Sequence, residues 1–325
     1  MLRRGGARTL VLLVAIVCIP EAGASRAAAG WVDERGPAAL GTARANAVER
    51  RPGLFECYGR LATIVGTTGP DALTGTSGRD VIVGRRGRDV IDGRGGNDFI
   101  CAGPGDDRVD GGGGDDNIEA STGHDALDGG PGRDFVSFFY ARRAVVADFA
   151  TGEASGRGLD LVRGFEGAVG SPFGDTFLGG PASEQFEGRG GNDRLEGGEG
   201  DDLLMPGPGR DRLGGGDGWD YALYWDARAG IWADLRGAQG GGRDRLEGIE
   251  GLAGSSFADV LTGDENTNGL YGYRGRDRLR GHGGDDRLFG GRGSDLLDGG
   301  PGTDLLDGGV GRDRCVRGEQ LRRCP

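Results

Sequence analysis

A period of nine residues organises the chain between Gly66 and Ser137. Divided into nonapeptides, this stretch reads GTTGPDALT, GTSGRDVIV, GRRGRDVID, GRGGNDFIC, AGPGDDRVD, GGGGDDNIE, ASTGHDALD and GGPGRDFVS. The fourth position is always Gly, the sixth is always Asp and the eighth is always aliphatic. Such a period is typical of repeat architectures, in which each unit stacks on its neighbours, and it constrains the fold more than any other feature.

The three fixed positions have different physical roles. Gly at positions one, two and four allows a tight turn that directs backbone carbonyl groups inward. The Asp at position six adds an anionic oxygen, and carbonyls with carboxylates are the ligands that Ca²⁺ prefers. Positions seven to nine fit a three-residue strand whose middle side chain points inward. Because one turn can neither complete the shell of an ion nor bury its aliphatic side chain, the repeat predicts a stacked array.

Two further blocks continue the pattern. Six nonads run from Gly170 to Leu223, and seven run from Gly254 to Val316. In the first two nonads of the second block, Phe173 and Ala182 replace the Gly at position four. The second of these nonads also has Glu184 in place of Asp at position six. The second nonad of the third block has Asn268 there. Weaker metal sites are expected at these three nonads.

The nonapeptide resembles the G-G-x-G-x-D-x-U-x motif of the RTX, or haemolysin-type, calcium-binding repeats. The resemblance implies an all-β fold, a right-handed parallel β-roll (a solenoid) of about 21 nonads in three blocks, with two nonads in each coil. It also implies that each Ca²⁺ lies between turns stacked on the same side, with ligands from nonads n and n+2. The alternative is that the aspartates only form turns. Turn propensity explains Asp near Gly, but it does not explain Asp at one phase of a nine-residue period.

The resemblance makes the position-six aspartates the candidate metal ligands. With one ion between each same-side pair, the three blocks would hold six, four and five ions, and the weak turns reduce the expectation to about a dozen Ca²⁺. The 19 candidates are Asp71, Asp80, Asp89, Asp98, Asp107, Asp116, Asp125, Asp134, Asp175, Asp193, Asp202, Asp211, Asp220, Asp259, Asp277, Asp286, Asp295, Asp304 and Asp313.

Two interruptions separate the blocks, at residues 138–169 and 224–253. They are homologous, because VVADF at 145–149 matches IWADL at 231–235. Similar segments in RTX arrays look like a hairpin laid on the roll. Their aromatic residues could stack on sugars or pack the hairpin against the roll, and packing is the favoured interpretation; they are Phe138, Phe139, Tyr140, Tyr224, Trp225 and Trp232.

The N-terminal residues 1–24 have the features of a secretory signal peptide. Arg3, Arg4 and Arg8 precede the apolar run Leu10 to Ile19, which is too short to span a bilayer comfortably, and no later segment is apolar enough to do so. The protein is therefore expected to be secreted, with no transmembrane segment after signal removal. The expected organisation is a linker at 25–56, a cap and first block at 57–137, a second block at 170–223, and a third block with a C-terminal disulfide cap at 254–325.

Four cysteines remain once the signal peptide is removed, and export favours disulfides. Cys315 and Cys324 are nine residues apart, so both fall at position eight, where the roll implied by the resemblance places side chains face to face. Stacked sheets lie about 10 Å apart, so a Cys315–Cys324 disulfide requires a narrowed last coil. Cys57 and Cys101 would then join the N-terminal cap to the fourth nonad. Free or intermolecular thiols are the alternative.

Composition excludes several functional classes. The net charge of −12 argues against nucleic acid as a partner. The chain contains no Lys, which excludes a P-loop, and it has no HExxH zinc motif, no G-x-S-x-G nucleophile elbow and no room for a separate catalytic domain. No enzyme activity is therefore expected.

The sequence favours a secreted calcium-binding repeat protein that folds on binding extracellular Ca²⁺ and has a structural or interaction role. The alternatives are a non-catalytic relative or accessory module of an RTX enzyme or toxin, and a cell-surface adhesin that binds cell-wall or extracellular polysaccharide.

Overall fold

The computed structural model describes residues 55–324 except 157, 237–238 and 241–243. The expected signal peptide and nearly all of the expected linker lie outside the described residues. Every regular element in the described part is a β-strand. None of the described residues forms a helix that is long and apolar enough to cross a membrane.

Strands pair in parallel with strands 18 residues later. Leu73 lies opposite Ile91 in one sheet, and Ile82 lies opposite Ile100 in the other. Successive nonads therefore alternate between two sheets, and two nonads complete one coil. This register confirms the predicted parallel β-roll.

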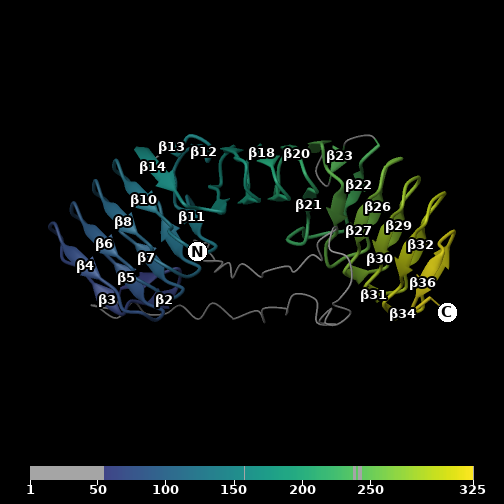
Figure 1. The fold of residues 1–325 in the computed structure, drawn as a ribbon, viewed down its shortest axis with the longest axis horizontal. Helices are drawn as coiled ribbons and strands as arrows, with labels where there is room; N and C mark the ends of the chain where they lie inside the picture. The colour runs from purple at the N-terminus through teal and green to yellow at the C-terminus, as the bar shows by residue number, and fades with distance from the viewer. Residues whose placement is uncertain (1–54, 157, 237–238, 241–243, 325) are drawn as a thin grey trace, which may run out of the picture.

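The two sheets form an arch, and we call them the inner and outer sheets after their places in it (Figure 1). The inner sheet has 14 strands in the order β3 (Ile64–Val65), β5 (Val81–Val83), β7 (Phe99–Cys101), β9 (Asn117–Glu119), β11 (Phe135–Ser137), β15 (Gly167–Val169), β17 (Gln185–Glu187), β19 (Leu203–Met205), β21 (Tyr221–Leu223), β25 (Gly251–Ala253), β27 (Gly269–Tyr271), β30 (Arg287–Phe289), β33 (Leu305–Asp307) and β36 (Gln320–Arg322).

The outer sheet lies on the convex side of the arch (Figure 1). Its strands are β4 (Ala72–Thr74), β6 (Val90–Asp92), β8 (Arg108–Asp110), β10 (Ala126–Asp128), β14 (Leu159–Arg163), β13 (Glu153–Ser155), β12 (Val146–Asp148), β16 (Thr176–Leu178), β18 (Arg194–Glu199), β20 (Arg212–Asp217), β24 (Asp244–Glu247), β23 (Gln239–Gly240), β22 (Trp232–Asp234), β26 (Val260–Thr262), β29 (Arg278–Arg280), β32 (Leu296–Asp298) and β35 (Arg314–Val316).

Each interruption inserts a hairpin into the outer sheet. Strand β13 pairs antiparallel with both β12 and β14, and β12 then pairs in parallel with β16. Three strands thus separate β10 from β16 in the outer sheet, whereas β15 alone separates β11 from β17 in the inner sheet. The second interruption repeats this arrangement with β24, β23 and β22. The expectation of a hairpin laid on the roll is therefore wrong.

These inserted strands explain the arch. At about 4.8 Å per strand, two extra strands lengthen the outer sheet by roughly 10 Å at each interruption. The inner sheet gains no such strands, so the roll bends with the outer sheet on the convex side, as Figure 1 shows.

The core is one continuous column of position-eight side chains. It runs from Ile82 through Phe177 and Phe186 to Leu306, and each of these four side chains is fully buried. Because most of the strands are three residues long, only the middle side chain of each of these points between the sheets. The core is therefore thin relative to the length of chain that it orders.

The aromatic residues of the interruptions contribute to packing. Phe138 and Tyr224 are buried in the core. Phe139 lies beneath the guanidinium group of Arg189, 3.6 Å from Cζ to the ring centroid. Trp225 donates from Nε1 to a methionine sulfur 2.9 Å away. The packing interpretation therefore holds for these four side chains.

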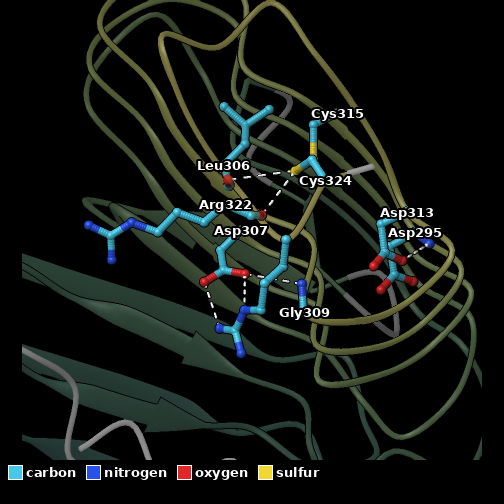
Figure 2. Close-up of a disulfide and its surroundings, with 9 residues drawn as sticks. Asp295, Leu306, Asp307, Gly309, Asp313, Cys315, Arg322 and Cys324 are labelled. Carbon is cyan, nitrogen blue, oxygen red and sulfur yellow. Dashed lines mark hydrogen bonds and ion pairs between the residues drawn. A yellow bond between two sulfur atoms is a disulfide. The ribbon is translucent and has the colours of Figure 1, made fainter. Parts of the chain in front are cut away.

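Disulfides close both ends of the roll. Cys57 is bonded to Cys101 and Cys315 to Cys324, which confirms both predicted pairings. The predicted register of Cys324 is wrong, because Leu321 takes position eight opposite Leu306. The last half-coil is three residues shorter than a nonad, so Cys324 lies beyond the strand, where it reaches Cys315 (Figure 2).

Short pairings outside the two sheets complete the fold. Near the N-terminus, β1 (Glu56–Cys57) pairs antiparallel with β2 (Arg60–Leu61). Toward the C-terminus, stacked turns form a three-stranded sheet from β28 (Arg274–Gly275), β31 (Arg292–Gly293) and β34 (Val310–Gly311).

Candidate calcium-binding sites

The position-six side chains form two columns, one along each edge of the roll. The backbone N–H of Asp98 donates to Oδ1 of Asp116 at 2.8 Å, and that of Asp89 donates to Oδ1 of Asp107 at 2.8 Å. The same contact recurs along both columns between residues 18 apart. Each carboxylate is thereby fixed against the coil that precedes it, because the stacked glycine turns bring consecutive same-side nonads into register.

The second carboxylate oxygen divides the 19 aspartates into two groups. In 15 of them Oδ2 is buried and has no hydrogen-bond partner among the described residues: Asp89, Asp98, Asp107, Asp116, Asp125, Asp134, Asp193, Asp202, Asp211, Asp220, Asp277, Asp286, Asp295, Asp304 and Asp313. We call the turns that contain these residues open turns. A buried carboxylate oxygen without a hydrogen-bond partner is costly, and a cation beside it would remove that cost.

The remaining four aspartates are satisfied by their own turns. The backbone N–H of Thr67 donates to Asp71 Oδ2 at 2.6 Å, and that of Ser171 donates to Asp175 Oδ2 at 2.6 Å. Asp80 and Asp259 have the same contact, with the N–H of Thr76 at 2.6 Å and that of Ser255 at 2.7 Å. At Asn268 the amide oxygen accepts from Asp264 at 2.7 Å. We call these five turns, which begin at Gly66, Gly75, Gly170, Gly254 and Gly263, closed turns.

Glu184 falls between the two groups. Its Oε1 accepts a hydrogen bond from the backbone N–H of Gly180 at 3.3 Å, as in a closed turn. Its Oε2 is buried without a hydrogen-bond partner in the described part of the chain.

Glycine is required where stacked turns touch. A Cβ on Gly105 would lie 1.5 Å from the carbonyl oxygen of Gly87, and a Cβ on Gly103 would lie 1.7 Å from that of Arg85. Turns on one side are thus in backbone contact, and carbonyl oxygens of the lower turn face the upper one. Hard oxygen atoms therefore surround the carboxylate column, which is the donor set that suits Ca²⁺.

Backbone conformation also separates the two kinds of turn, with one exception. Position two has a positive φ in the open turns even where it is not Gly, as at Arg85 (83°), Arg189 (73°) and His282 (85°), and Ser121 alone among them lies outside this region. Thr67 and Ser171 in closed turns lie outside this region. A side chain in the left-handed region costs about 1–2 kcal/mol, so the open turn must be stabilised by something that the closed turn does not need.

In the metal-free fold, burial raises the pKa of several open-turn carboxyl groups into the neutral range. Burial raises the pKa of Asp116 to about 7 and that of Asp202 to about 8. Hydrogen bonds from the backbone lower both pKa values, and the charges of neighbouring carboxylates in the column raise them further. A nearby cation would reverse this balance by favouring the ionised form.

Sequence reasoning missed carboxylates within the interruptions. Asp160 lies at position six of a nonad that stacks on the first block, and Asp125 donates to its Oδ1 at 3.0 Å. Asp244 is placed in the same way, and its Oδ1 accepts from the backbone N–H of Asp211 at 3.0 Å. The x-D-x-U-x pattern was visible at both places, but the inserted hairpin shifts it out of phase with the preceding nonads.

Three shortened half-coils end the blocks with Glu. In each case Oε2 of the Glu accepts a hydrogen bond from the backbone N–H of a position-six aspartate in the preceding coil. The pairs are Asp134 with Glu166 at 2.7 Å, Asp220 with Glu250 at 3.0 Å, and Asp304 with Glu319 at 2.7 Å. These half-coils lack the glycine turn, and the longer side chain of Glu spans the difference. The common E-x-U-x pattern, GFEGAV, GIEGLA and RGEQLR, is the signal that could have identified them.

The ligand set at each place would be small in side chains and rich in backbone. Within the described residues, no three His, Cys, Asp or Glu side chains gather into a metal-binding cluster. In Figure 2, Asp295 and Asp313 lie side by side in one column, with the N–H of Asp295 donating to Oδ1 of Asp313 at 3.0 Å. One or two carboxylates with turn carbonyls fit Ca²⁺ better than the soft or nitrogen-rich sites of transition metals.

A family model described as RTX calcium-binding nonapeptide repeat (4 copies) matches residues 65–100, 102–136, 178–213, 247–279 and 280–315. A comparison with curated proteins gives no match. The matched segments cover more than half of the chain and include most of the open turns. The chain therefore belongs to the RTX family of calcium-binding nonapeptide-repeat proteins.

Proposed function

We propose that this protein is an extracellular, non-catalytic repeat protein whose roll forms when Ca²⁺ binds between its open turns. The observation that carries the proposal is the set of buried Oδ2 atoms without hydrogen-bond partners, repeated in register along both columns. The open turns number six, four and five in the three blocks. We accordingly assign about fifteen ions to the chain, each held by one of these aspartates and by turn carbonyls.

The ion would supply the positive charge that the columns need. Carboxylates in adjacent coils lie about 4.8 Å apart in a partly buried environment, so their mutual repulsion opposes stacking. Ordering a chain with 73 Gly residues also costs much backbone entropy, and the thin core offsets only part of it. Since the sites exist only in the stacked array, metal binding and folding are one process.

Extracellular placement is supported by three features. The sequence of residues 1–24 resembles a signal peptide. One disulfide closes each end of the roll, and disulfides persist mainly in oxidising compartments. Extracellular calcium modules bind in the range of about 10⁻⁴ to 10⁻³ M, which suits a chain that folds only after export.

A second candidate function is adhesion to polysaccharide. Tyr140 is 50% exposed and Trp232 is 49% exposed, although the other aromatics of the interruptions pack against the roll. Exposed rings on a rigid scaffold are suited to stacking on sugars. Retention of the calcium-loaded protein on insoluble polysaccharide, and its loss in Tyr140→Ala with Trp232→Ala, would support this function.

The experiment for the main proposal is a calcium titration of the chain without residues 1–24, followed by far-UV circular dichroism. We expect a cooperative gain of β-structure with Ca²⁺ up to about 10 mM and no comparable gain with Mg²⁺. A chain that is already folded in chelator would contradict the proposal.

A further inference from the structure

Each block begins with turns that need no metal. The closed turns at Gly66 and Gly75 start the first block, the closed turn at Gly170 starts the second, and those at Gly254 and Gly263 start the third. None of the open turns lies ahead of them within its block. The two kinds of turn are therefore ordered along the chain.

The coils beneath the closed turns explain this order. The backbone N–H of Val145 donates to Oδ1 of Asp175 at 2.8 Å, and that of Ile231 donates to Oδ1 of Asp259 at 2.9 Å. Val145 and Ile231 occupy the position-six places of the inserted hairpins, which have no glycine turn and no carboxylate. An ion that required two stacked glycine turns would have no lower half at these places.

The closed turn satisfies the carboxylate without such an ion. In Asp175 and Asp259, Oδ2 accepts the position-two N–H and Oδ1 accepts the position-two hydroxyl, at 2.8 Å from Ser171 and from Ser255. In Asp80 the Thr76 hydroxyl also donates to Oδ2, at 2.9 Å, and Oδ1 accepts from the Thr63 hydroxyl at 3.2 Å. Both carboxylate oxygens have hydrogen-bond donors, so these aspartates gain nothing comparable from a metal.

The third block provides a natural substitution. Asn268 accepts from the N–H of Asp264 at 2.7 Å and donates from Nδ2 to the carbonyl of Glu250 at 3.3 Å. A neutral amide that accepts one hydrogen bond and donates another replaces the carboxylate at this closed turn. The place therefore requires a hydrogen-bond acceptor and not a charged ligand.

We propose that the closed turns are metal-independent starting points from which calcium-driven folding of each block proceeds, and that Asp71, Asp80, Asp175 and Asp259 are positioning residues rather than calcium ligands. This inference rests on the proposed calcium-dependent folding. An open turn needs an already formed turn beneath it, because its ion lies between the two. A closed turn forms from local hydrogen bonds and provides the first surface on which an ion can be held.

The test uses the full chain without residues 1–24 and the quadruple variant Thr67→Gly, Thr76→Gly, Ser171→Gly and Ser255→Gly. Glycine removes the hydroxyl and frees position two for the positive φ of an open turn. We expect Ca²⁺-triggered folding, followed by stopped-flow circular dichroism, to slow about fivefold or more, since each lost hydrogen bond belongs to the nucleus. The number of bound ions at saturation should be unchanged.

Ser121→Gly is the matched control. Ser121 also lies at position two, but its hydroxyl donates to the carbonyl of Gly103, and Oδ2 of Asp125 in the same turn has no hydrogen-bond partner. Its folding rate should stay within about twofold of the wild-type rate. Equal slowing in this control, an unchanged rate in the quadruple variant, or a loss of bound ions from the quadruple variant would each overturn the inference.

Failure of the proposed function has a different signature. A wild-type chain that is folded in chelator, or that binds no Ca²⁺, would refute calcium-dependent folding before any variant is compared. A wild-type chain that folds with Ca²⁺, with a quadruple variant that folds equally fast, would refute only the role of the closed turns.

Discussion

The backbone N–H of Asp98 donates to Oδ1 of Asp116, 18 residues later, at 2.8 Å, while Oδ2 of Asp116 is buried without a hydrogen-bond partner. The contact uses one oxygen to hold the carboxylate against the preceding coil and leaves the other beside the turn. The same relationship recurs along both columns, so one local geometry accounts for register, burial and the expected metal sites together.

Asp116→Asn should remove one ion, because an amide is a weaker ligand than a carboxylate. The calcium concentration at the folding midpoint should rise, and the ion count at saturation should fall by one. Asp175→Asn is the matched control, since Asn268 already occupies the equivalent kind of turn. Calcium counting by elemental analysis after equilibrium dialysis distinguishes the variants. An equal loss in both would contradict the division between open and closed turns.

Gly105→Ala should destabilise the calcium-loaded roll by roughly 2–4 kcal/mol, because the new Cβ would lie 1.5 Å from the carbonyl oxygen of Gly87. Gly69→Ala tests the same repeat position in a closed turn, where the nearest atom would be Thr67 Oγ1 at 3.9 Å. This control should change the free energy of unfolding by less than about 1 kcal/mol. Urea denaturation in saturating Ca²⁺ compares the two variants, and similar losses would argue against direct stacking of the turns.

The metal-free chain should gain structure at acidic pH. Burial raises the folded-state pKa of Asp107 to about 6, of Asp193 to about 7 and of Asp202 to about 8, above the ordinary value of 3.8. The folded state then binds more protons than the unfolded state, so this contribution to stability is complete below about pH 4 and is lost as pH rises through 6 to 8.

Far-UV circular dichroism in chelator should therefore show more β-structure at pH 4 than at pH 8. Sedimentation must confirm that the acidic sample is monomeric, because the sequence pI is about 4.8. A metal-free chain that is equally unfolded at both pH values would show that proton binding cannot replace the ion.

The two disulfides should contribute unequally. Loop closure entropy predicts about 4 kcal/mol for Cys57–Cys101, whose residues are 44 apart, and about 2.6 kcal/mol for Cys315–Cys324, whose residues are nine apart. Cys57→Ser with Cys101→Ser should thus lower the free energy of unfolding more than Cys315→Ser with Cys324→Ser. Urea denaturation in saturating Ca²⁺ measures both pairs, and the reverse order would show that strain or end capping outweighs entropy.

The periodic part of the fold could be predicted from the sequence because its register is local. Position eight of each nonad sets the core, and Ile82 opposite Ile100 follows from the 18-residue coil. The Cys315–Cys324 pairing followed from the nine-residue spacing in the implied roll, and Cys57–Cys101 was the pair that remained. The aspartate columns are a direct consequence of the same period.

The bends could not be predicted in this way. The order of β14, β13 and β12 reverses the direction of stacking, and only pairing between distant strands determines it. Asp160 and Asp244 escaped notice because the inserted hairpins move them out of phase. The position of Cys324 was wrong for the same reason, since the shortened half-coil with Glu319 changes the spacing by three residues.

Position two held a signal that the sequence analysis missed. Thr67, Thr76, Ser171 and Ser255 each precede the Asp of their nonad by four residues, which lets their N–H and hydroxyl groups reach its carboxylate. Ser121 shows that the pattern alone is insufficient, because its turn stacks on another glycine turn and stays open. The coil beneath decides between the two states.

The most direct test of the account is the number of Ca²⁺ ions bound per chain at saturation. Equilibrium dialysis of the chain without residues 1–24, with protein and calcium measured in the same sample, gives this number. The account predicts about fifteen ions, one for each open turn. A count near nineteen would make every position-six aspartate a ligand, and a count of zero would leave the buried carboxylates unexplained, so either result would contradict the account.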